Sequence, residues 1–238
     1  MFSLHSHKEA VLWTVATGAL LFSGSACTAT MTVHAVVQDD RGNLVQDAIV
    51  YAEALRNGIP PPTETRKAGT GHEKRVNIDM ENQAFIPLVL PVQIGTAVSF
   101  MNRDAIQHHI YSISPEKQFE LTIRKGASSA DLVFDKPGVV VMGSTINDRM
   151  IGYIYVLKTP WFARTGADGK AELRDLPKGA YDVRVWHPGM KRLPEAAAKR
   201  VVSSSRGEAS AKFSLTLQPA LNPGAAPTPP VLPAGGGK

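Results

Sequence analysis

The chain lacks the residues on which several classes of protein depend. Cys27 is the only cysteine among 238 residues, so no disulfide bond can form within the chain. Charged residues account for 20% and hydrophobic residues for 43%, a balance that excludes a membrane protein with several spans. The Lys and Arg residues form no run and do not alternate with aromatic residues, so the sequence predicts no nucleic-acid partner.

Catalytic motifs are missing as well. The sequence contains no Ser-His-Asp order, no His-Glu-x-x-His pair and no phosphate-binding or dinucleotide-binding loop. It also contains no paired carboxylates in a recognisable frame, and His34 and His72 are isolated. We therefore predict that the protein is not an enzyme.

The N-terminus has the three parts of a secretory signal. Lys8 precedes an apolar stretch from Ala10 to Phe22, and the small residues of 23–26 follow it. We predict a signal peptide over residues 1–29, no membrane span in the mature chain, and a periplasmic or secreted protein. Two alternatives remain open: a retained N-terminal anchor, and a lipoprotein modified on Cys27.

The rest of the chain has the pattern of β-structure. Short alternating segments are separated by Gly, Pro, Asn and Asp, and no long segment has helical periodicity. About eight such segments follow closely between Arg75 and Lys158, which is typical of a Greek-key sandwich. We therefore predict an all-β protein. The strands expected in this block are 76–80, 85–92, 98–100, 110–113, 119–123, 131–134, 138–142 and 153–157.

Two segments of this block carry a resemblance to a known family. Residues 102–110 read Asn-Arg-Asp-Ala-Ile-Gln-His-His-Ile, and residues 143–152 read Gly-Ser-Thr-Ile-Asn-Asp-Arg-Met-Ile-Gly. Together with Phe85 to Gly95 they resemble the cupredoxins, most closely the amicyanin type and periplasmic proteins of methylamine utilisation. The resemblance covers about Ile78 to Pro188. It implies a cupredoxin-like sandwich in a family that performs copper-dependent electron transfer.

The resemblance also indicates where copper ligands would lie. In the family the second segment reads Cys-x-x-His-x-x-Met, and the first segment supplies another histidine. His108 and Met150 match ligand positions, whereas Ser144 stands at the Cys position and Asn147 at the second His position. A blue-copper centre needs two imidazoles and a thiolate, and neither a protonated hydroxyl nor an amide oxygen replaces them. We therefore predict a degenerate site at which copper is lost or weakly bound.

Simpler interpretations of the retained residues stay open. His108 is alternatively an ordinary polar residue at a loop edge, and Met150 is alternatively a core filler. On a strand, His108 and His109 point to opposite faces, so they do not easily share one metal. Trp186-His187-Pro188 ends a predicted strand, and His187 is either a hydrogen-bonded strand-end residue or a metal or interdomain contact.

The regions on either side of the central block resemble a second family. Val33 to Tyr51 and Thr165 to Val185 contain turns and alternating strands like those of the carboxypeptidase-regulatory-like sandwich, which is small and Ig-like. Neither region alone has enough strands for a stable core, so we predict that the cupredoxin-like sandwich is inserted between them. The predicted divisions are a signal peptide at 1–29, the first part of the flanking sandwich with a linker at 30–74, the cupredoxin-like domain at 75–158, the second part at 159–217, and a disordered Pro/Gly/Ala-rich tail at 218–238.

Three functional hypotheses follow. The leading one is an exported cupredoxin-like protein without a blue-copper centre, acting as a binding or assembly module with an unknown periplasmic protein partner. The second is a weak copper carrier or electron-transfer protein that uses His108 and Met150. The third is a cell-envelope scaffold whose flanking sandwich is the working surface.

Overall fold

The computed structural model describes residues 30–55, 75–190, 197–202 and 207–218, and these residues form β-strands and their connections. The prediction of an all-β protein is confirmed. No helix in the described ranges is long and apolar enough to cross a membrane. The predicted signal peptide, the lipidation alternative at Cys27, and residues 219–238 of the predicted tail lie outside these ranges.

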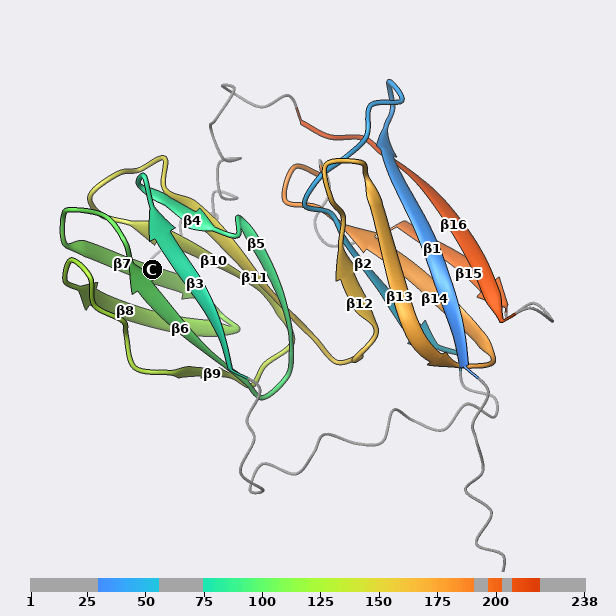
Figure 1. The fold of residues 1–238 in the computed structure, drawn as a ribbon, viewed down its shortest axis with the longest axis horizontal. Helices are drawn as coiled ribbons and strands as arrows, with labels where there is room; N and C mark the ends of the chain where they lie inside the picture. Colours follow the sequence, from blue (N-terminus) through green and yellow to red (C-terminus); the bar gives the residue numbers. More distant parts are fainter. Residues whose placement is uncertain (1–29, 56–74, 191–196, 203–206, 219–238) are drawn as a thin grey trace, which may run out of the picture.

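Strands β3 to β11 form a two-sheet sandwich, drawn in green and yellow in Figure 1. One sheet has the order β4-β3-β6-β9 and the other the order β5-β11-β10-β7-β8. Strand β3 is parallel to β6 and β5 is parallel to β11, so the chain crosses between the sheets as a Greek-key sandwich requires. The bounds are β3 Arg75–Glu81, β4 Ala84–Ile86, β5 Val89–Gln93, β6 Thr96–Asn102, β7 His108–Ser114, β8 Lys117–Ile123, β9 Leu132–Phe134, β10 Gly138–Ser144 and β11 Ile151–Leu157.

Alternation of side chains builds the core of this central sandwich. In β7, every second residue from His108 is buried, and the residues between them face outward. The expected single strand over 85–92 is wrong, because β4 and β5 lie in different sheets. Pro87 falls between them and has no N–H to continue a ladder, so the chain changes sheets there.

Strands from both ends of the described chain form a second, flanking sandwich. Its sheets have the orders β13-β1-β16 and β12-β2-β14-β15. Figure 1 shows β1 and β16 side by side, although they are far apart in the sequence. The predicted domain boundaries remain a prediction. The bounds are β1 Thr30–Asp39, β2 Ile49–Ala54, β12 Phe162–Arg164, β13 Lys170–Pro177, β14 Ala180–Trp186, β15 Ala197–Val202 and β16 Glu208–Leu215.

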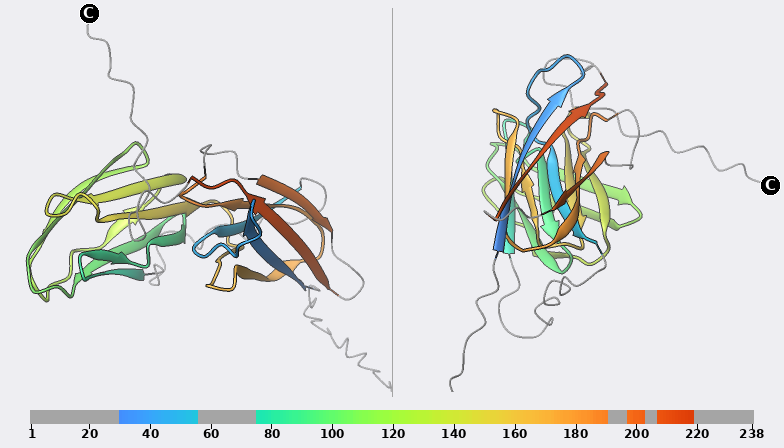
Figure 2. Two further views of the ribbon diagram at one scale, coloured as in Figure 1. Left: turned by 90° about the horizontal axis from the view of Figure 1, so that it is seen from above. Right: turned by 90° about the vertical axis from the view of Figure 1, so that its right-hand side faces the viewer.

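A third apolar cluster joins the two sandwiches, which lie end to end in Figure 2. The rings of Tyr155 and Trp186 pack with their centroids 5.0 Å apart. The hydroxyl groups of Tyr51 and Tyr155 lie 3.2 Å apart, which adds a polar contact to the apolar one. The junction is therefore a packed interface. Its buried members are Ile49, Tyr51, Val89, Tyr153, Leu157 and Trp186.

Candidate functional site

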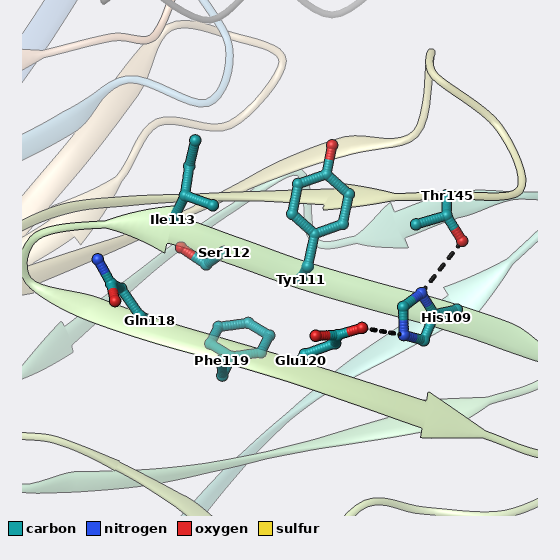
Figure 3. A pocket seen from close by; sticks show the side chains of 8 residues that line it. All are labelled: His109, Tyr111, Ser112, Ile113, Gln118, Phe119, Glu120 and Thr145. Carbon is teal, nitrogen blue, oxygen red and sulfur yellow. Dashed lines mark hydrogen bonds and ion pairs between the residues drawn. The ribbon is translucent and has the colours of Figure 1, made fainter. Parts of the chain in front are cut away.

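The two adjacent histidines of β7 have opposite environments, as the alternation predicts. His108 points into the sandwich and is fully buried, and its Nε2 lies 2.7 Å from a carboxylate oxygen of Asp104. Its other ring nitrogen, Nδ1, is buried with no hydrogen-bond partner. His109 points outward, where it contacts Glu120 at 2.8 Å and Thr145 at 3.2 Å (Figure 3). The prediction that the two histidines point to opposite faces of the strand is confirmed.

The carboxylate of Asp104 joins His108 to the turn between β3 and β4. One oxygen accepts a hydrogen bond from the backbone N–H of Asn82 at 2.6 Å, and the other accepts one from Gln83 at 3.0 Å. Asn82 and Gln83 both have positive φ, 52° and 56°, a conformation that needs support in residues other than glycine. Burial raises the pKa of Asp104, but the hydrogen bonds from Gln83, His108 and Asn82 outweigh it and hold the pKa below its usual range.

The side chain of Asn102 holds the loop that precedes His108. It is fully buried at the end of β6 and donates to the carbonyl oxygens of Ile106 and Ile123 at 2.8 Å and 2.9 Å. Its own oxygen accepts the N–H of Asp104 at 3.0 Å. Asn102 therefore fixes both the position of Asp104 and the entry into β7. The sequence pattern indicated no role for Asn102 or Gln83, because Ile123 and Asn147, their partners far along the chain, approach them only in the folded sandwich.

Three candidate residues lie in or beside the loop between β10 and β11, namely Ser144, Asn147 and Met150, and each has a different environment. Met150 is 1% exposed and belongs to the core of the central sandwich. Ser144 is buried at the end of β10, and its hydroxyl accepts a hydrogen bond from the N–H of Ile146 at 3.3 Å. The amide of Asn147 donates to the side chain of Gln83 at 3.1 Å, and its oxygen accepts the N–H of Arg149 at 3.0 Å.

Hydrogen bonds thus connect three loops at one end of the central sandwich. His108 contacts Asp104, Asp104 holds the Asn82–Gln83 turn, and Gln83 contacts Asn147. We call these five residues the Asp104 network. Because Asn147 bonds to Gln83 and to its own loop, both its amide nitrogen and its amide oxygen are engaged.

Two glycines keep the β10–β11 hairpin close to its neighbours. A Cβ added to Gly152 would lie 2.8 Å from the ring of Phe85, and one added to Gly143 would lie 3.0 Å from the ring of Tyr111. The distance at Gly152 is shorter than side-chain packing allows, whereas the exposed Tyr111 ring has to shift by only a few tenths of an ångström to admit a Cβ at Gly143. The sequence Gly143 to Gly152 is therefore constrained by its packing against aromatic rings.

The donor atoms at this end do not fit a blue-copper centre. His108 offers one imidazole nitrogen, Nδ1, and Met150 offers a thioether. Ser144 and Asn147 supply neither the thiolate nor the second imidazole that such a centre needs. Within the described part of the chain, no group of three or more His, Cys, Asp or Glu side chains is placed to hold a metal ion.

His187 lies apart from this end of the molecule, directly after β14 in the flanking sandwich. Its Nδ1 accepts a hydrogen bond from the N–H of Gly189 at 3.0 Å. Burial lowers the pKa of His187 to about 4, although a backbone hydrogen bond with Gln46 opposes the shift. His187 is therefore a neutral, hydrogen-bonded residue near neutral pH.

The chain matches no protein-family model and no curated protein. Its resemblance to solved structures is confined to part of the chain. A copper-containing nitrite reductase from Thermus scotoductus SA-01 is 27% identical, with 36% of this chain and 23% of that chain covered and a TM-score of 0.34. A reduced amicyanin mutant is 19% identical, with 38% and 88% covered and a TM-score of 0.33. A purple cupredoxin from Nitrosopumilus maritimus is 24% identical, with 34% and 98% covered and a TM-score of 0.31.

This chain is similar to each of these three proteins over about a third of its own length. The matched part spans less than a quarter of the nitrite reductase. The strand order of the two sandwiches defines an all-β protein with a central Greek-key sandwich and a second, flanking sandwich.

Proposed function

We propose that this is an exported, non-enzymatic binding or assembly module whose central sandwich descends from a copper protein and whose copper site is degenerate. The cupredoxin resemblance of residues 102–110 and 143–152 supports the copper-protein origin. The secretory pattern of residues 1–29 supports export to the periplasm or the exterior. The flanking sandwich, which resembles the carboxypeptidase-regulatory-like family, is a second surface available to an unknown periplasmic protein partner.

The observation that carries the proposal is the set of side chains at the four ligand positions. Only one imidazole is present, and its Nε2 is bound to Asp104. Asn147 engages Gln83 instead of facing an open coordination position, and Ser144 bonds within its own loop. The Asp104 network therefore connects loops that a metal would otherwise join. This arrangement suits a protein that keeps the sandwich and does not transfer electrons through copper.

Copper titration followed by visible absorption tests the proposal. A thiolate ligand gives copper(II) an intense charge-transfer band, and this protein has no thiolate among residues 30–238. We expect purified mature protein to gain only weak absorption on addition of copper(II). An intense blue or purple product would contradict the proposal.

A weak copper carrier is the second candidate, and the unpartnered Nδ1 of His108 is the observation that favours it. Isothermal titration with copper(I) under reducing conditions compares the wild type with His108→Ala and with His34→Ala. His34 is a matched control because it lies on β1 in the flanking sandwich. Binding that is lost only in His108→Ala supports the carrier. Equal binding, or none, in all three proteins excludes it.

A further inference from the structure

The central sandwich protects three of its four sheet edges. An edge strand leaves unpaired N–H and C=O groups, and short strands or prolines prevent other strands from pairing there. Strands β4 and β9 have three residues each, and β5 contains Pro91. The fourth edge, β8, has seven residues, contains no proline and pairs with β7 in an uninterrupted register. Strand β8 is thus a long, regular edge.

The hydrogen-bond pattern defines which groups of β8 face the open side. The N–H of Thr145 donates to the carbonyl of His109 at 3.0 Å, so the backbone of His109 faces β10. Backbone directions alternate along a strand, so His108, Ile110 and Ser112 face β8. Their partners in β8 are Ile123, Leu121 and Phe119. The residues between those partners, Gln118, Glu120 and Thr122, therefore direct their N–H and C=O groups to the open edge, and all three side chains are exposed.

Strand β16 presents a second long edge, in the flanking sandwich. It ends the sheet β13-β1-β16 and pairs with β1 in a parallel, regular register. The N–H of Thr32 donates to the carbonyl of Gly207 at 2.9 Å, so odd-numbered residues of β16 face β1. The even-numbered residues Glu208, Ser210, Lys212 and Ser214 therefore direct their backbone groups away from β1, and their side chains are also exposed.

Each edge carries a charge that can pair with a charge on the other edge. Glu120 lies at the centre of the β8 edge with 73% of its side chain exposed and also contacts His109 of its own chain, and Lys212 is exposed on the β16 edge. If two copies of β8 paired symmetrically with full overlap, Glu120 would face Glu120. Like charges directly opposite one another destabilise a strand pair, whereas opposite charges stabilise it.

We propose that β8 of one copy of this chain pairs antiparallel with β16 of a second copy, with Glu120 opposite Lys212. In this register each edge-facing residue of one strand meets an edge-facing residue of the other, which allows a continuous ladder. Lys212 of β16 lies opposite Glu120, and the small serine side chains of β16 lie opposite Gln118 and Thr122. The three pairs are Gln118 with Ser214, Glu120 with Lys212, and Thr122 with Ser210.

An open groove of about 600 Å³ borders the β8 edge on its outer face. Figure 3 shows the side chains that line it. Tyr111 and Ile113 line it with 38% and 69% of their surfaces exposed. Both lie on β7, opposite Glu120 and Gln118. The aliphatic stem of Lys212 from the second copy would extend toward these side chains, while its ammonium group reaches Glu120.

The contact joins two different surfaces, so it generates open head-to-tail chains of molecules unless the rotation closes a ring. This inference deepens the proposed function, on which it rests, by naming a second copy as the partner in assembly. It does not depend on any property of the Asp104 network. A failure here would therefore leave the copper titration as a separate test of the proposed function.

Sedimentation equilibrium of the full mature chain, over a wide concentration range, tests the proposal. We expect wild-type protein to self-associate, and Glu120→Lys and Lys212→Glu each to weaken association about tenfold by turning attraction into repulsion. The double variant Glu120→Lys with Lys212→Glu restores the pair and should associate like the wild type. Asp135→Lys and Lys136→Glu are matched controls, because they make the same charge changes at exposed positions outside both edges.

Hydrogen exchange locates the contact. In associated wild-type protein, the amides of Gln118, Glu120 and Thr122 should gain protection, and those of Ser210, Lys212 and Ser214 should gain it as well. An equimolar mixture of the two single variants should associate, because each supplies the other with an opposite charge. A wild type that stays monomeric would overturn the proposal. So would association that both single variants leave unchanged, or that protects other strands.

Discussion

Removal of the Asp104 carboxylate is the perturbation that most directly probes the connected loops. Asp104→Ala would break its contacts with Asn82, Gln83 and His108, at 2.6, 3.0 and 2.7 Å. His108 is fully buried and its Nδ1 already has no partner, so both ring nitrogens would then be unsatisfied. A buried polar group left unpaired costs about 1–3 kcal/mol, and the two turn N–H groups, which can bind water, add about 0.5–1 kcal/mol each. We expect a total loss of about 2–5 kcal/mol.

Urea denaturation followed by circular dichroism measures this loss as the change in free energy of unfolding. Asp135→Ala is the matched control, since Asp135 is exposed in the turn before β10, and we expect it to change stability by less than about 0.5 kcal/mol. A second variant separates the buried histidine from the turn. Asp104→Ala combined with His108→Leu removes the orphaned ring, so the double variant should be more stable than the sum of the two single changes predicts.

The reasoning would be refuted if Asp104→Ala were as stable as its control. It would also be refuted if the amides of Asn82 and Gln83 exchanged at the wild-type rate in that variant. Either result would mean that the carboxylate is hydrated in solution and that the turn is held by other contacts.

Three further predictions concern packing and pH. Gly152→Ala should destabilise the protein by about 1–3 kcal/mol in urea, because its Cβ would lie 2.8 Å from the Phe85 ring. Trp186→Ala should lower stability by about 3–5 kcal/mol and increase proteolytic cleavage between the sandwiches, since Trp186 packs on Tyr155 at their junction. The pKa of His187 is lowered by burial from 6.5 to about 4, so protonation favours the unfolded chain. Stability should fall by about 3 kcal/mol between pH 6.5 and pH 4 in thermal melts, and His187→Gln should remove that part of the loss.

The parts of the fold that depend on local pattern were predictable from the sequence. Alternation predicted that His108 and His109 point to opposite faces, and the structure confirms this and shows that His108 is the buried one. The prediction of one strand over 85–92 was wrong. The apolar residues of this segment suit one continuous strand as well as two short strands in different sheets, so the sequence alone does not show that the chain changes sheets at Pro87. Only the pairing of β5 with β11 and of β4 with β3 separates the two cases.

The contacts of the candidate site were not predictable in the same way. Asp104 and Asn82 are 22 residues apart, and their bond depends on the parallel pairing of β3 with β6. The Asn82-Gln83 pair was a usable signal, because asparagine tolerates positive φ in turns. No sequence pattern indicates that Gln83 then reaches Asn147, since that contact requires the turn and the β10–β11 loop to meet.

The edge strands illustrate the same limit. Strand β8 was expected at 119–123, but its position at the end of a sheet follows only from the sheet order. The complementarity of Glu120 and Lys212 therefore becomes visible only when both edges are known. Charge in a sequence indicates exposure, and strand order decides which exposed charges can meet another molecule.

The central claim of the proposed function is that the loop from Gly143 to Gly152 derives from a copper loop and has lost its thiolate and imidazole ligands. Visible spectra with copper(II), recorded for the wild type and for Ser144→Cys combined with Asn147→His, test it most directly. The double change supplies the missing thiolate and imidazole beside His108 and Met150. We predict weak absorption for the wild type and an intense thiolate-to-copper band for the variant. An intense band in the wild type, or its absence in the variant, would contradict the claim.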